Sequence, residues 1–413
     1  MTEELDAAPL PLLKPRKNYH IVQNDNDLNE LLRNLDDVEN RIALDAERAS
    51  GFRYGQKAYL IQVAFENSDI YLVDPIASFN ETLLEKLRDL VNSRTWIIHA
   101  ATQDLECLRE FGLVPRKILD TELAGRLCGL PKVSLGTMCE IFLNVRLAKE
   151  HSAVDWSTRP LPDSWLNYAA LDVDVLFDLW ECVEQELLKQ GKLEIALEEF
   201  QNLTNQVQKP EKIDRWRSVT GIHEIKDVRQ LTIIKSLWEA REHLAKQKDV
   251  APGRLIPDSS LINAVKAAPK SKSELSELRS FSGRASRTYL DLWWDAYESG
   301  STTTALVDLR QKTVGIPNHR NWANRFPEAH TRLIWSKKLL QEVSVELGIP
   351  LENLINPDAL KHICFEPDGT TLKEIEDYLN RLGVRSWQIN LVSGVLVEAF
   401  GKTELPEGEE PKV

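Results

Sequence analysis

The sequence predicts an α/β domain built on a mixed β-sheet, followed by two small all-α domains. Three observations support this prediction. Strand and helix patterns alternate over residues 19–207, the strand pattern stops after Gln206, and the helical remainder contains a weak internal repeat. A chain of 413 residues is long enough for two or three domains of ordinary size.

Apolar and β-branched runs bounded by turn residues predict the strands of the first domain, and apolar residues at helical spacing predict its helices. Strands are expected at Arg41–Leu44, Ala58–Ala64, Ile70–Val73 and Trp96–Ile98. Helices are expected at Leu28–Leu35, Phe79–Val91, Asp104–Phe111, Thr121–Cys128 and Trp165–Glu186. The short interval from Tyr59 to Val73 suits a hairpin, so antiparallel strands are expected in the sheet.

The remaining boundaries follow from composition and repetition. Residues 1–18 are predicted to be a flexible tail, 208–222 a linker, and 403–413 a disordered tail rich in Glu, Pro and Gly. Helical domains are predicted at 223–302 and 325–402. The segments Leu255-Ile256-Pro257-Asp258 and Leu354-Ile355-Asn356-Pro357-Asp358 are similar and lie about one hundred residues apart, which favours a duplicated helical domain over chance.

The charge is unevenly distributed along the chain. The net charge of −13 lies entirely within residues 1–210, where 22 Lys and Arg face 35 Asp and Glu; residues 211–413 are neutral. The simpler interpretation is an acidic surface that keeps the protein soluble. The alternative is an acidic site that gathers cations before it meets a polyanionic substrate.

Composition excludes several other classes of protein. The sequence contains no run of eighteen apolar residues, so no membrane span is predicted. The N-terminus lacks the basic-then-apolar order of a signal peptide, so a cytoplasmic protein is expected. The five cysteines are widely spaced and odd in number, which favours reduced thiols over zinc ligands or disulfides. The sequence contains neither the glycine-rich phosphate-binding loop of dehydrogenases nor that of kinases, which argues against both classes of enzyme.

Three segments carry candidate catalytic acids. Asp45 and Glu47 end a strand and share one of its faces, where a divalent cation between them would relieve their repulsion. Asp104 begins a helix that follows His99. A favourable interaction with the helix dipole explains an Asp at this position as well as a catalytic role does. Tyr168 and Asp172 lie four apart on one helix face. Each segment alone is also compatible with ordinary solvated acids or a packed tyrosine.

Taken together and in order, these segments resemble the DEDD superfamily of 3′→5′ exonucleases, specifically ribonuclease D. The matching motifs are Leu44-Asp45-Ala46-Glu47, His99-Ala100-Ala101-Thr102-Gln103-Asp104-Leu105 and Tyr168-Ala169-Ala170-Leu171-Asp172. The resemblance covers about residues 40–190. It implies an RNase-H-like fold, hydrolysis to nucleoside 5′-monophosphates and, because position 168 is Tyr, the tyrosine subclass. Residues 223–302 resemble the nucleic-acid-binding HRDC domain, and 325–402 resemble a diverged second copy.

The expected chemistry is metal-dependent hydrolysis of RNA. Hard oxygen ligands favour Mg²⁺ or Mn²⁺, and two such ions would clamp the attacking and leaving oxygens. One ion is assigned to Asp45, Glu47 and Asp172, and the other to Asp45 and Asp104, with Tyr168 orienting the attacking water. The expected substrate is single-stranded or tRNA-like RNA with a free 3′ end. Candidate substrate-binding residues are Ala46, His99, Arg254, Lys270 and Arg284.

Two alternatives remain open. One is a DNA-directed 3′→5′ exonuclease of the same superfamily, acting in repair. The other is an inactive RNA-binding protein, against which the intact set of four acids and Tyr168 argues. Ala46 and the run Arg48-Ala49-Ser50 depart from the Thr and Phe more usual in ribonuclease D, which puts substrate preference in doubt more than chemistry. No protein partner is predicted.

Overall fold

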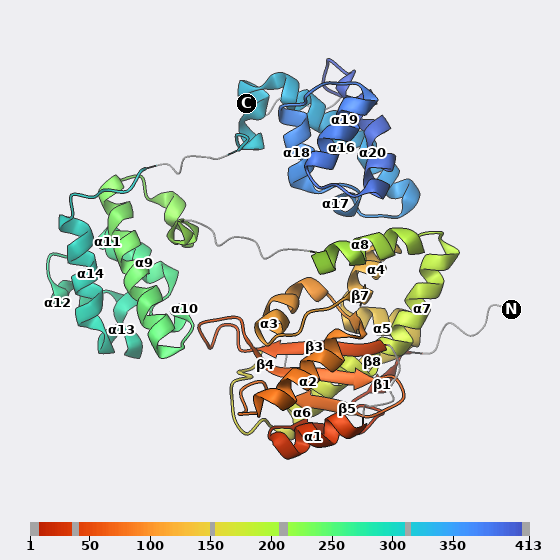
Figure 1. Cartoon of the computed structure of the whole chain (residues 1–413). Helices are drawn as coiled ribbons and strands as arrows, with labels where there is room; N and C mark the ends of the chain where they lie inside the picture. Colours follow the sequence, from red (N-terminus) through yellow and green to blue (C-terminus); the bar gives the residue numbers. More distant parts are fainter. Residues whose placement is uncertain (1–7, 35–40, 149–152, 206–213, 310–314, 407–413) are drawn as a thin grey trace.

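A computed structural model describes residues 8–34, 41–148, 153–205, 214–309 and 315–406 (Figure 1). We call residues 8–205 the α/β domain, 214–309 the first helical module and 315–406 the second helical module. Among the described residues, no helix has both the length and the apolar character that a bilayer span requires.

The α/β domain is built on a six-stranded mixed sheet with strand order β2-β5-β4-β3-β6-β7. The predicted hairpin is β4 and β5, and β3 pairs antiparallel with β4 to extend it into a meander. The strands β2, β6 and β7 add parallel strands at its sides. The bounds are β2 Tyr19–Val22, β3 Arg41–Arg48, β4 Ala58–Phe65, β5 Ile70–Val73, β6 Thr95–Ile98 and β7 Lys117–Asp120. The mixed sheet is confirmed, although the sequence pattern did not reveal the two edge strands β2 and β7.

Helices cover both faces of the sheet. One face packs against α1 (Asp25–Asn34), α2 (Glu81–Asn92) and α3 (Leu105–Glu110), and the other against α4 (Thr121–Leu127), α6 (Asp163–Asp174) and α7 (Leu176–Lys189). Side chains of β3 alternate between the two faces, so Ile42, Leu44 and Ala46 enter the core under α1 and α2. Ala43 packs on the α6 side instead, and Asp45 and Glu47 share that side.

Several elements differ from the sequence prediction. The predicted helix Trp165–Glu186 is two helices, α6 and α7, which meet at Val175. The predicted tail at 1–18 contains a strand, because β1 (Leu10–Leu12) pairs in parallel with β8 (Val145–Leu147); residues 1–7 lie outside the described residues. The sequence pattern also did not reveal α5 (Leu135–Leu143) or α8 (Leu193–Asn205).

The predicted linker and C-terminal tail are described only in part. Trp216, in the short helix η2 (Arg215–Ser218), is buried in the core of the first helical module, so this part of the predicted linker belongs to the module. The Trp335 indole donates to the Glu404 carbonyl oxygen at 2.6 Å, which ties the start of the predicted tail to the second module. Residues 208–213 and 407–413 lie outside the described residues.

The two helical modules run through a similar succession of helices. The first comprises α9 Val228–Lys248, α10 Pro252–Leu255, α11 Asp258–Ala267, α12 Lys272–Glu277, α13 Arg284–Thr288 and α14 Leu290–Thr302. The second comprises α15 Trp322–Arg325, α16 Pro327–Leu347, α17 Leu351–Leu354, α18 Pro357–Phe365, α19 Leu372–Arg381 and α20 Ser386–Phe400. Both α9 and α16 have 21 residues and precede a four-residue helix. Duplication of one ancestral domain stays a prediction.

The second helical module shares a hydrophobic core with the α/β domain. One cluster of buried residues contains Trp180 and Phe200 of the α/β domain together with Trp322 and Trp387 of the module. Glu199 of α8 accepts hydrogen bonds from the Arg385 guanidinium and from the Trp387 indole at 2.8 Å. The α/β domain and the last ninety or so described residues (315–406) therefore form one packed unit.

The first helical module has its own core and meets the α/β domain at the loop that follows β3. The Arg254 side chain donates to the Gly51 carbonyl oxygen at 2.6 Å and lies 4.0 Å from the centre of the Phe52 ring. The Ala251 amide donates to the Phe52 carbonyl oxygen at 3.0 Å, and the Tyr54 hydroxyl bonds Glu242 at 3.2 Å. Arg254 is thus engaged in holding the two domains together.

Candidate active site

The first half of the acid site comes from the sheet. Asp45 and Glu47 lie near the end of β3 on the face covered by α6, because side chains two apart on a strand point the same way. The opposite side of the strand, with Leu44 and Ala46, is apolar and buried, and this fixes the register. The two acids are therefore turned toward the helix that carries the next pair of candidate residues.

The second half comes from α6. Tyr168 and Asp172 lie one turn apart on the helix, and the Tyr168 hydroxyl donates a hydrogen bond to the Asp172 carboxylate. Carboxylate oxygens of Asp45, Glu47 and Asp172 all lie within 4.8 Å of one another. The tertiary fold thus gathers three of the predicted acids, from positions 127 residues apart, at one point.

Asp104 is the fourth acid, and its side chain turns toward the same pocket. It stands at the N-terminal end of α3, yet its carboxylate makes no capping hydrogen bond to that helix. Instead it shares a hydrogen bond with Asp45, and its residue is only 5% exposed. The structure therefore places Asp104 at the acid site, hydrogen-bonded to Asp45, and it does not cap α3.

The loop that presents Asp104 is held from beneath by Asp120. Its carboxylate accepts hydrogen bonds from the amides of Ala100 and Ala101, at 3.1 and 2.9 Å, and from Glu122 and Leu123 at the start of α4. Ala100 adopts a left-handed conformation, with φ of 58°, which an L-residue tolerates only when its surroundings hold it. The sequence pattern did not predict this role for Asp120.

The electrostatics of the acid site favour a cation. Burial, followed by the charge of Asp45, raises the pKa of Asp104 to about 8. Burial is also the main cause of the raised pKa values of Asp45, Glu47 and Asp172, and neighbouring carboxylates add to it for Glu47 and Asp172. A divalent cation would remove this penalty, and an all-oxygen ligand set suits Mg²⁺ or Mn²⁺. The residues therefore fit a metal site.

Tyr168 and His99 stay neutral near pH 7. Burial and the Asp172 carboxylate raise the pKa of the Tyr168 phenol, so it retains its proton. Burial lowers the pKa of His99 to about 4, and the Nδ1 atom of this ring lies 2.9 Å from Thr121 Oγ1. Both side chains line the acid pocket, which has a volume of about 260 Å³. They are suited to hydrogen bonding rather than to carrying charge.

Arg48 also lines this pocket, and the sequence analysis did not predict that. Adjacent strand residues normally point to opposite faces, but the pairing of β3 with β4 shifts register between Glu47 and Arg48. Such a bulge redirects the side chain that follows it. As a result Arg48 Nη2 lies 3.5 Å from Asp104 Oδ1. A guanidinium group is thus available inside the pocket for a phosphate or a nucleotide.

The five predicted substrate-binding residues fall into separate places. Ala46 and His99 line the acid pocket, although the Ala46 residue is only 6% exposed and its side chain packs into the core, so it presents mainly its backbone. Arg254 and Arg284 line a wide groove of about 950 Å³ in the first helical module, together with Arg279 and Tyr289. Lys270 is exposed and does not line that groove.

The raised pKa of Asp104 makes a prediction about stability without metal. The pKa of an Asp in the unfolded chain is about 3.9. Between that pH and about 8, Asp104 therefore holds a proton in the folded state that it has lost in the unfolded state. The metal-free protein should therefore lose stability as pH rises through this range. Asp104→Asn removes the titration, and we expect a higher melting temperature than wild type at pH 8 in chelator, with a difference that shrinks toward pH 4.

Glu106→Gln, at an exposed position two residues further along, is the matched control and should behave as wild type at every pH. Equal melting temperatures for Asp104→Asn and wild type at pH 8 would contradict the buried, mutually repelling cluster of acids.

Comparison with known proteins identifies the class to which this fold and site belong. Residues 19–188 match a family described as 3′-5′ exonuclease, residues 230–297 match the HRDC domain, and residues 315–400 match a 3′ to 5′ exonuclease C-terminal domain. With four acids and a tyrosine around one pocket, the protein is a 3′→5′ exonuclease of the DEDD type. The family matched by the second helical module is not HRDC, so its HRDC-like origin stays a prediction.

Whole-chain relatives narrow the class to one family. Ribonuclease D of Escherichia coli is 31% identical over 300 residues, covering 71% of this chain and 75% of that protein. Ribonuclease D of Bartonella henselae is 30% identical over 344 residues, covering 81% and 79%. The chain belongs to the ribonuclease D family, and it is a hydrolase of the 3′→5′ exoribonuclease class.

Solved structures agree with this assignment. A protein from Bifidobacterium adolescentis aligns over 95% of this chain and 100% of its own, with a TM-score of 0.83 and 31% identity. Escherichia coli RNase D, described as an exoribonuclease involved in structured RNA processing, aligns over 92% and 98%, with a TM-score of 0.66 and 26% identity. The predicted arrangement of an α/β exonuclease domain followed by helical domains is confirmed.

Proposed function

We propose that the chain removes nucleotides singly from the 3′ end of single-stranded or tRNA-like RNA and releases nucleoside 5′-monophosphates, in tRNA 3′ processing or RNA turnover. The observation that supports this most strongly is the approach of Asp45, Glu47 and Asp172 oxygens to within 4.8 Å, with Asp104 bonded to Asp45 beside them. Asp45, Glu47 and Asp172 would hold one divalent ion, and Asp45 with Asp104 a second.

The protein's own groups supply position and hydrogen bonds for the reaction. Bound Mg²⁺ or Mn²⁺ supplies the positive charge that stabilises an in-line displacement at phosphorus. The protonated Tyr168 hydroxyl, fixed on Asp172, orients the attacking water. Neutral His99 lines the pocket that would receive the terminal nucleotide, while Arg48 offers its guanidinium to a phosphate oxygen.

The proposal is tested by digesting RNA labelled at one end. With a 3′ label and Mg²⁺ or Mn²⁺, the first product should be a labelled mononucleotide; with a 5′ label, a ladder should shorten progressively. Chelator should stop both. Release of labelled oligonucleotides from the 3′-labelled strand would exclude exonucleolytic cleavage, and turnover in chelator would exclude the metal site.

The same assay decides between the remaining alternatives. A DNA strand of matched sequence lacks the 2′-hydroxyl, so preference for DNA would support the repair exonuclease. Tight RNA binding without any cleavage in Mg²⁺ or Mn²⁺ would support the inactive binding protein. The resemblance to an exoribonuclease of structured RNA processing favours RNA hydrolysis over both.

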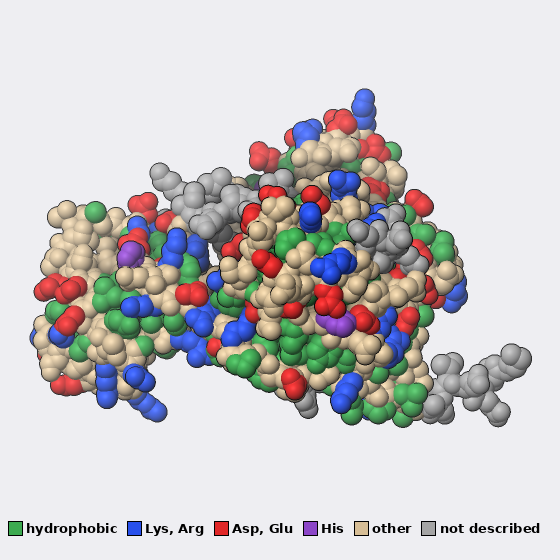
Figure 2. Space-filling model, turned by 60° about the horizontal axis from the view of Figure 1, so that its bottom comes forward, with side chains coloured by type: hydrophobic (Ala, Val, Ile, Leu, Met, Phe, Trp, Pro, Cys, Tyr) green, Lys and Arg blue, Asp and Glu red, His purple; other side chains and the backbone are tan. Residues whose placement is uncertain are grey.

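The first helical module is proposed to hold the body of a structured RNA. Lys and Arg side chains gather where this module meets the α/β domain (Figure 2), and Arg279 and Arg284 line its wide groove. Replacing both with alanine should weaken binding of a tRNA-like RNA in low salt. It should also reduce the slope of log affinity against log salt concentration by about one to two. Degradation of a short oligonucleotide should be unchanged.

Filter binding at several salt concentrations measures this effect. Lys270→Ala serves as the comparison, since Lys270 carries the same charge on the same module but lies outside the groove. An equal loss of affinity in Lys270→Ala would show that the groove has no special role, and a parallel loss on short oligonucleotides would place the two arginines in catalysis.

A further inference from the structure

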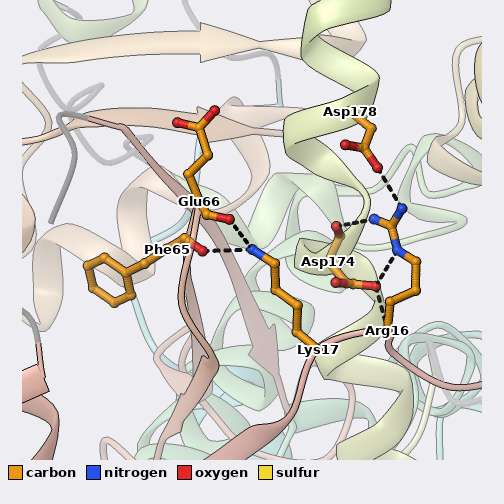
Figure 3. A network of polar contacts seen from close by, with 6 residues as sticks. All are labelled: Arg16, Lys17, Phe65, Glu66, Asp174 and Asp178. Atoms are coloured by element: carbon orange, nitrogen blue, oxygen red, sulfur yellow. Dashed lines mark hydrogen bonds and ion pairs between the residues drawn. The ribbon is translucent and has the colours of Figure 1, made fainter.

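Two residues of the N-terminal segment, Arg16 and Lys17, bridge the helix and the sheet that each carry part of the acid site (Figure 3). Asp45 and Glu47 come from the sheet, whereas Asp172 and Tyr168 come from α6. The distance between these two groups depends on how α6 lies against the sheet. A contact that joins helix and sheet directly therefore acts on the geometry of the site.

Arg16 holds the end of the helix. Its guanidinium donates to the Asp174 carboxylate at 2.9 Å, to the Asp174 carbonyl oxygen at 2.7 Å and to the Asp178 carboxylate at 2.6 Å. Its backbone amide adds a fourth bond to the Asp174 carboxylate at 2.8 Å. Asp174 ends α6, two residues after Asp172, and α7 begins at Leu176. The guanidinium thus spans the junction of the two helices at the negative end of α6.

Lys17 holds the sheet. Its ammonium group donates to the carbonyl oxygens of Phe65, at 2.7 Å, and Glu66, at 2.5 Å, and it also lies 5.1 Å from the centre of the Phe177 ring of α7. Phe65 ends β4 and pairs with Ile42 of β3, the strand that carries Asp45 and Glu47. The adjacent residues Arg16 and Lys17 therefore contact both the helix α6 and the sheet that carry the acid site.

We infer that Arg16, anchored to the sheet through Lys17, is a positioning residue that sets α6 against β3 and so brings the Asp172 carboxylate within reach of Asp45 and Glu47. This inference rests on the proposed metal-dependent function. It assigns residues 16 and 17, just before β2, a role in building the metal site, although neither of them lines the acid pocket.

The test is a calorimetric titration of the full-length protein with Mn²⁺ in the absence of RNA. Arg16→Ala should bind Mn²⁺ about tenfold more weakly, since several charge-assisted hydrogen bonds are lost together. The Mn²⁺ concentration for half-maximal cleavage of a short RNA should rise in proportion, with KM for RNA unchanged. Arg16→Lys should restore part of the affinity, because an ammonium group cannot reproduce the planar fork.

Lys14→Ala is the matched control, because it removes the same charge from an exposed position two residues earlier and should leave Mn²⁺ affinity unchanged. Equal Mn²⁺ affinity in Arg16→Ala and Lys14→Ala would overturn the inference. If Arg16→Ala does not fold, Asp178→Asn, which removes one half-exposed contact, decides: about twofold to threefold weaker binding is expected, and wild-type affinity would overturn the inference. Absence of Mn²⁺ binding in the wild type would count against the proposed function instead.

Discussion

Asp172→Asn is expected to lower kcat on a short RNA by about a thousandfold, which corresponds to about 4 kcal/mol of transition-state stabilisation. The amide keeps the size of the carboxylate but has no negative charge, and the Asp172 oxygens lie within 4.8 Å of those of Asp45 and Glu47. Asp104→Asn should lower kcat similarly, because it removes the carboxyl group that is hydrogen-bonded to Asp45. Steady-state cleavage of a 3′-labelled RNA in saturating RNA and Mg²⁺ measures kcat for both variants.

Asp163→Asn is the control for Asp172→Asn, since it lies exposed in the first turn of the same helix and should keep wild-type activity. Melting temperatures in chelator separate loss of catalysis from loss of fold, because both active-site variants should be at least as stable as wild type there. Near-normal turnover in Asp172→Asn or Asp104→Asn would remove that residue from the proposed catalytic set.

Glu199→Ala is expected to lower the free energy of unfolding by about 3 kcal/mol. The Glu199 side chain is 6% exposed, and it pairs with Arg385, whose side chain is 22% exposed. It also accepts the Trp387 indole hydrogen bond. Alanine would leave a largely buried guanidinium and an indole donor without their acceptor, at the joint between the α/β domain and the second helical module.

Urea unfolding followed by tryptophan fluorescence measures this loss, with Glu194→Ala, exposed in the first turn of the same helix, as the control. In both variants the α/β domain and the second module are expected to unfold in one shared cooperative transition, because one hydrophobic core extends through both. The first module has its own core and is expected to unfold separately. A Glu199→Ala variant as stable as Glu194→Ala would show that the joint contributes little, and separate transitions for the two parts would contradict the shared core.

The two helical modules are expected to have different roles, because the second shares a core with the α/β domain and the first has a core of its own. The second module is built into the catalytic unit, so truncating the chain before residue 315 would expose part of a shared core. The first module has a separate core and touches the α/β domain at the loop after β3, which makes it the better candidate for handling the body of a structured substrate. The match to HRDC coincides with this separate module.

The raised pKa of Asp104 and the loss of activity expected for Asp104→Asn describe two sides of one feature. The acids are costly to the folded protein because they are buried near one another, and the same closeness makes them suitable ligands for a cation. A variant that gains stability without metal and loses catalysis would show both effects in one molecule.

The sequence alone predicted the mixed α/β class and the helical remainder, because strand and helix periodicities are local in the chain. Its resemblance to ribonuclease D pointed to the acids at positions 45, 47, 104 and 172 and to Tyr168. What each acid does was a tertiary question: a helix dipole explained Asp104 equally well until the fold turned its carboxylate toward Asp45. Arg48 enters the pocket through a bulge formed with β4, and Arg254 binds Gly51, 203 residues away. Leu10–Leu12 pair with β8, and Arg16 binds the junction of α6 and α7. Each of these outcomes depends on a partner distant in sequence, and a local pattern carries no information about such a partner.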